Sequence, residues 1–142
     1  MLLLFGALLA LFVCVGLPLC WLTRRRLRQL ADSRIRGGEA GGADFVAYCS
    51  ENGLHRDAIR QAYHYLQGCV DTEDFPIRLD DALCGQLKID RDEIEDIVID
   101  LARICGCGVQ WDEDALSLDE PTVRDLLDLV IEWRGCKPAK HT

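Results

Sequence analysis

Residues 90–105 read Asp-Arg-Asp-Glu-Ile-Glu-Asp-Ile-Val-Ile-Asp-Leu-Ala-Arg-Ile-Cys, and this stretch carries the clearest helix signal of the chain. Apolar side chains recur every three or four residues, which is the period of an α-helix with one buried face. Asp90 and Glu93 resemble a capping box at the amino end, where acidic side chains also complement the helix dipole. We therefore predict a helix that begins after Asp90 and ends at Gly106. Its inward stripe consists of Ile94, Ile97, Val98, Leu101 and Cys105.

Similar periodicity predicts further helices on both sides of this stretch. Asp44 is placed to cap the first of them, and Pro121 or Thr122 begins the last. Between the second and third helices, residues 71–89 contain Pro76 and are predicted to be irregular, with a brief helical turn at 80–86. The sequence thus indicates one small all-α domain over residues 43–137. The flanking helices are expected at residues 44–53, 55–68 and 121–133.

The predicted domain is strongly acidic. From Ala43 to Lys137 there are 22 Asp and Glu residues against nine Lys and Arg, a formal charge of −13. Such a domain is a poor ligand for a phosphate backbone, which attracts the opposite charge. Nucleic acid is therefore excluded as a partner.

Part of this domain resembles an acyl carrier protein. The resemblance runs from Ile77 to Trp133. It rests on Leu87-Lys-Ile-Asp90 leading into the acidic helix, and on the closing segment Pro121-Thr-Val-Arg-Asp-Leu-Leu-Asp-Leu-Val130. It implies a small acidic carrier-like helical bundle, in which the second main helix is the surface that docks on partner proteins.

The chain departs from the carrier pattern at the position that would bear the prosthetic group. Carrier proteins attach phosphopantetheine to a serine at the start of that helix, whereas this chain has Arg91 between Asp90 and Asp92. Arginine offers no hydroxyl, so no cofactor is expected. In this respect the chain resembles carrier-like uncharacterised bacterial proteins that keep the helical frame and lack the serine.

The resemblance therefore implies an interaction module without catalysis, which presents an acidic helix to a basic cytoplasmic protein. A stripe of one charge steers association and sets specificity. Two other readings remain open: the acids form an ordinary solvated face, or the domain is a degenerate or true carrier of an acyl chain or lipid. The predicted partner-docking residues are Asp92, Glu93, Glu95, Asp96 and Asp100.

Neither an enzyme nor a metal site is predicted. The three histidines are scattered, and no nucleophile with a base and an orienting group is evident. Cys105 and Cys107 are separated by one residue, and no second closely spaced pair completes a zinc site. We expect no catalytic residues and no metal, and we expect the cysteines outside residues 1–22 to be small buried apolar residues or free thiols.

The amino-terminal residues 1–22 carry no charged side chain, and arginines follow at once. As a helix, 22 residues reach about 33 Å, enough for a hydrocarbon core of about 30 Å. We predict an uncleaved transmembrane anchor rather than a signal peptide, because the run is long and no basic residue precedes it. The positive-inside rule then gives a single-pass protein of the bacterial inner membrane, amino terminus outside and domain in the cytoplasm. The arginines expected at the membrane surface are Arg24, Arg25, Arg26 and Arg28.

The bilayer is accordingly a predicted partner, and anionic headgroups would attract those arginines. An alternative is a small membrane protein that acts through its transmembrane helix, where Gly6 and Ala10 would permit close helix approach. Residues 23–42 form the expected basic segment and glycine-rich linker, and residues 138–142 a polar tail.

Overall fold

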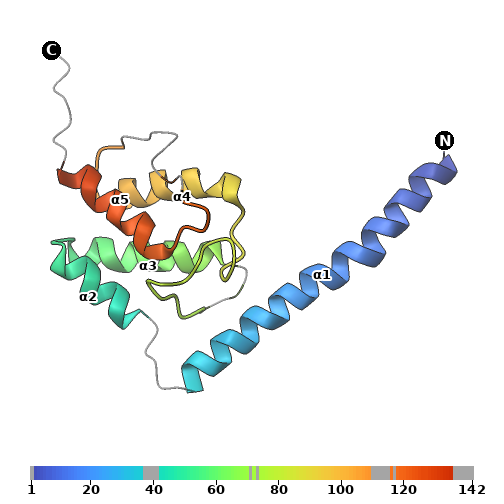
Figure 1. Cartoon of the computed structure of the whole chain (residues 1–142), viewed down its shortest axis with the longest axis horizontal. Helices are drawn as coiled ribbons and strands as arrows, with labels where there is room; N and C mark the ends of the chain where they lie inside the picture. Colours follow the sequence, from blue (N-terminus) through green and yellow to red (C-terminus); the bar gives the residue numbers. More distant parts are fainter. Residues whose placement is uncertain are drawn as a thin grey trace, which may run out of the picture.

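The structure is a computed structural model of the whole chain. It describes residues 2–36, 42–70, 72, 74–109, 116 and 118–135, and for residues 2–17 and 36 it describes the backbone alone. Within these residues the regular structure is helical, as the all-α prediction requires. The five helices are α1 (Leu2–Arg36), α2 (Ala43–Glu51), α3 (Arg56–Cys69), α4 (Arg91–Ile104) and α5 (Val123–Gly135). Figure 1 shows α2 to α5 gathered into a bundle and α1 extending away from it.

Helix α4 begins and packs where its sequence indicates. Asp90 is its N-cap residue, and the Asp90 carbonyl accepts a hydrogen bond from the Glu93 amide at 3.0 Å. The Asp90 side chain makes no cap bond, so the expected capping box is not formed. The buried face consists of Ile94, Ile97, Val98, Leu101 and Ala102, whereas Cys105 lies at the C-cap and is half-buried.

Side-chain caps do form at the starts of α3 and α5. The Nδ1 atom of His55 accepts from the Asp57 amide at 3.4 Å, so His55 is the N-cap of α3. Thr122 and Asp125 bond reciprocally at α5: the Asp125 carboxylate accepts from the Thr122 amide at 2.7 Å, and the Thr122 hydroxyl accepts from the Asp125 amide at 3.4 Å. This is the pattern of a capping box, and it defines the first turn of α5.

Helix α2 begins differently from the prediction. Its N-cap is Gly42 at a φ of 92°, and Asp44 lies in the first turn. A side chain at Gly42 would meet the Tyr63 ring at 2.8 Å, so both the backbone angle and the space require glycine. The Asp44 carboxylate instead accepts from the amides of Phe45 at 2.9 Å and Leu79 at 3.4 Å.

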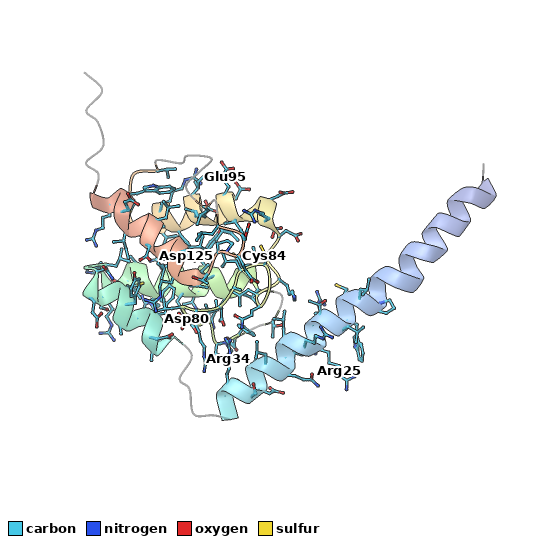
Figure 2. All side chains as sticks on the ribbon, in the orientation of Figure 1. Arg25, Arg34, Asp80, Cys84, Glu95 and Asp125 are labelled. Carbon is cyan, nitrogen blue, oxygen red and sulfur yellow. The ribbon has the colours of Figure 1, made fainter. Side chains whose placement is uncertain are left out.

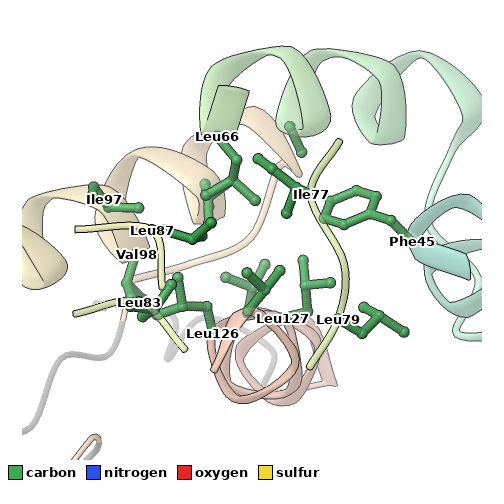
Figure 3. Packing of buried hydrophobic residues seen from close by; sticks show 14 of the residues in the cluster. Phe45, Leu66, Ile77, Leu79, Leu83, Leu87, Ile97, Val98, Leu126 and Leu127 are labelled. Carbon is green, nitrogen blue, oxygen red and sulfur yellow. The ribbon is translucent and has the colours of Figure 1, made fainter. Parts of the chain in front are cut away.

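The irregular segment before α4, residues 74–90, runs through the core. Three backbone hydrogen bonds hold it to the start of α5: Leu83 donates to Pro121, Val123 to Asp81, and Arg124 to Leu79, at 2.9 to 3.0 Å. Its apolar side chains therefore lie between the helices, as Figure 3 shows for Ile77, Leu79, Leu83 and Leu87. The buried side chains of the segment include Phe75, Ile77, Leu79, Leu83, Leu87 and Ile89.

Helix α1 contacts the bundle through its carboxyl end. Leu27 and Ala31 are buried, and the Arg34 side chain is 7% exposed. Arg34 pairs with Asp81 and also donates to the carbonyl of Pro76 at 2.7 Å. The predicted basic segment thus contains one arginine that belongs to the protein interior.

The prediction of a transmembrane anchor over residues 1–22 is corrected. Over the residues that the structure describes, none of the helices has the length and apolar character needed to cross a membrane. Helix α1 does not end near Leu22 but continues to Arg36, and its described side chains include the exposed arginines at 24, 25, 26 and 28. The side chains of residues 2–17 lie outside the description. This finding contradicts the predictions of a single-pass membrane protein and of an inner-membrane location.

Candidate docking surface on helix α4

The outer side of α4 carries four carboxylates that we call the acidic face. Figure 2 shows Glu95 on the side of α4 that points away from the bundle. All four side chains are exposed, while the opposite side of the helix is in the core. Within the part of the chain that the structure describes, none of the four forms an ion pair or a hydrogen bond. The acidic face consists of Asp92, Glu93, Glu95 and Asp96.

These carboxylates repel one another along the helix. Residues 92 and 96, 92 and 95, and 93 and 96 are three or four positions apart, and each such like-charge pair costs about 0.2–0.5 kcal/mol. Asp92 and Glu93 lie in the first turn, where the positive end of the dipole offsets part of this cost. Glu95 and Asp96 lie beyond that turn, so the helix dipole stabilises their charges less. A cationic partner would therefore stabilise the face.

Asp100, the fifth predicted docking residue, has a structural role instead. Its carboxylate accepts a hydrogen bond from the Tyr65 hydroxyl at 3.0 Å and pairs with the Arg103 guanidinium at 2.8 Å. Burial and the bond to Asp100 raise the pKa of Tyr65 well above its ordinary value. The structure therefore separates Asp100 from the unpaired carboxylates of the acidic face.

Arg91, which the predicted resemblance aligns with the serine of carrier proteins, connects two segments. Its guanidinium donates to the carbonyls of Leu118 at 3.0 Å and Asp119 at 3.2 Å. These bonds hold the chain before α5 against the first turn of α4. Among the serines, Ser33 lies on α1 and Ser50 on α2, away from this turn, and Ser117 lies outside the described residues.

The cysteines of the helical domain that the structure describes are free thiols: Cys49 is buried, and Cys69, Cys84, Cys105 and Cys107 are half-buried. Burial raises the pKa of Cys49 to about 12 and that of Cys105 to about 11, so both thiols stay protonated near neutral pH. The Cys107 thiol donates to the carbonyl of Cys105 at 3.7 Å. Among the described residues, no group of three or more His, Cys, Asp or Glu side chains is placed to hold a metal ion.

The arginines predicted for a membrane surface lie exposed on α1, and we call them the arginine cluster: Arg24, Arg25, Arg26 and Arg28. The Arg25 guanidinium lies 5.2 Å from the centre of the Trp21 ring. Arg24 and Arg28 line an open groove of about 990 Å³, whose other wall includes His64 and Gln67 of α3. The sequence pattern did not indicate this groove, because it depends on how α1 docks on α3.

Comparisons with protein-family models, with curated proteins and with solved structures found no match to this chain. The carrier-protein resemblance therefore stays a prediction that rests on the residues quoted for it.

Proposed function

We propose that the helical domain is a non-catalytic interaction module that binds a basic protein partner through the acidic face of α4. The observation that carries the proposal is the set of four exposed carboxylates that lack a cationic partner within the described residues. A surface of this kind attracts a cationic partner at long range and disfavours an anionic one.

Some acids on other elements, in contrast, are paired. Asp57 pairs with Arg60 at 3.2 Å, and Asp80 with Arg124 at 3.5 Å. Next to the acidic face, by contrast, the two nearest arginines of α4 are engaged elsewhere, Arg91 with backbone carbonyls and Arg103 with Asp100. The face is thereby left without a cation from its own helix.

The test is capture of a partner by the tagged full chain and by a charge-reversed variant, Glu95→Lys with Asp96→Lys. Both side chains are exposed, so helicity measured by circular dichroism should stay unchanged. We expect the variant to lose a partner that wild type retains at low salt and releases at high salt. A matched control, Glu51→Lys with Glu132→Lys, makes the same charge change on exposed positions of α2 and α5 and should retain the partner. Equal capture by wild type and the α4 variant would contradict the proposal.

A further inference from the structure

The arginine cluster and the acidic face are complementary in charge, and the chain carries both. Arg25, Arg26 and Arg28 are exposed on α1. Only Leu27, Ala31 and Arg34 among the described side chains of this part of α1 are buried. The arginine side of α1 is therefore open to another molecule.

The spacing of the two charged surfaces also agrees. Asp92 and Glu95 are three residues apart on α4, and Arg25 and Arg28 are three residues apart on α1, which is a rise of about 4.5 Å in each helix. Asp96 lies beside the acidic pair on α4. Two helices packed side by side at an interaxial distance of about 8–10 Å can therefore place carboxylates opposite guanidinium groups.

The two surfaces of one molecule cannot meet. Arg34 is held at the bundle by its buried pair with Asp81, which fixes the carboxyl end of α1. Figure 2 shows Glu95 on the outer side of α4, and Arg25 on α1 at the far side of the bundle. The complement of the acidic face must therefore come from a second molecule.

We propose that the basic partner is a second copy of this chain, whose arginine cluster binds the acidic face of the first. This inference rests on the proposed function, since it names the partner of the same face. The contact joins two different surfaces, so it is heterologous. One molecule keeps its arginine cluster unused and the other keeps its acidic face, and each can bind a further copy. Because the charges are exposed, the assembly is salt-sensitive.

The test is self-association of the full chain, measured by sedimentation velocity in a non-ionic detergent at about 50 mM and about 500 mM NaCl. The detergent prevents the uncharged residues 1–22 from driving association by themselves. We expect concentration-dependent oligomers at low salt that dissociate at high salt. Reversal of either surface, by Glu95→Lys with Asp96→Lys or by Arg25→Glu with Arg28→Glu, should weaken association about tenfold or more. The Glu51→Lys and Glu132→Lys control should associate like wild type.

Mixing the two variants gives the sharper result. An equimolar mixture of the two reversed variants should associate although neither does so alone, because the first variant keeps its arginine cluster and the second keeps its acidic face. Failure of the mixture to associate, or a monomeric wild type at low salt, overturns the inference. If a monomeric wild type still captures a different basic protein through Glu95 and Asp96, the proposed function stands while the second copy is excluded. A wild type that is monomeric and also captures no basic protein would overturn both the inference and the proposed function.

Discussion

The guanidinium of Arg34 and the carboxylate of Asp81, 47 residues apart in the chain, form a two-pronged ion pair inside the protein. The two bonds measure 2.8 and 2.5 Å, and the side chains are 7% and 2% exposed. Arg34 also lies 5.2 Å from the centre of the Phe75 ring, and the Arg78 amide donates to Asp81. This one pair connects the end of α1 to the segment that threads the core.

Asp81→Ala should destabilise the protein by about 3–5 kcal/mol, because it leaves the Arg34 guanidinium buried without its counter-charge. Urea unfolding of the full chain measures this loss. The control is Asp80→Ala at the neighbouring position, whose side chain is 88% exposed and should contribute about 0–1 kcal/mol. The double variant Arg34→Met with Asp81→Ala should be less destabilised than Asp81→Ala alone. Equal losses for Asp80→Ala and Asp81→Ala would show that the pair is not as buried as described.

The Arg34–Asp81 pair is also a contact that the sequence alone did not predict. The periodicity of apolar residues predicted α3, α4 and α5, because the buried face of each helix consists of apolar side chains that recur every three or four residues. Arg34 was placed in the basic segment 23–42, because no local pattern distinguishes an arginine that pairs with a carboxylate 47 residues away. Residues 71–89 were predicted to be irregular, and those of them that the structure describes are irregular. Their place in the core depends on backbone bonds to the start of α5, which leave no periodic signal.

The candidate docking surface was likewise predicted only in part. The acidic stripe was visible from spacing, and four of its five carboxylates lie exposed on one helix. Asp100 was grouped with them because it has the same spacing, but its bond to Tyr65 of α3 depends on how the helices pack. The anchor prediction considered residues 1–22 in isolation, whereas the helix they belong to continues to Arg36 and docks on the bundle.

The stability of the protein should fall with rising pH partly through Cys49. Burial raises the pKa of this thiol from 9.0 to about 12, with a smaller contribution from nearby Cys105. Above pH 9 the unfolded thiol releases its proton and the folded one does not, so stability present below pH 9 is lost as the pH rises toward 12. Cys49→Ala lacks this group, and its denaturation midpoint should therefore fall less between pH 8 and pH 10 than that of wild type. Parallel pH profiles for the two proteins would contradict the prediction.

Arg91 makes the chain unable to accept phosphopantetheine at the start of α4. We expect the full chain, coexpressed with a phosphopantetheinyl transferase, to show by intact mass spectrometry the mass of the unmodified sequence. A carrier protein treated in the same way provides the positive control. A phosphopantetheine adduct on this chain would overturn the interpretation of Arg91 and favour a true carrier.

Carboxylate footprinting of the partner-bound protein tests the proposed docking surface most directly. Exposed carboxylates are converted to amides with a carbodiimide and an amine, with and without the partner retained on capture, and each position is quantified by mass spectrometry. The proposed function predicts that labelling falls at Asp92, Glu93, Glu95 and Asp96 on binding, whereas exposed Asp80 and Glu132 keep theirs. Unchanged labelling of the α4 carboxylates in the complex, or an equal fall at Asp80 and Glu132, would contradict it.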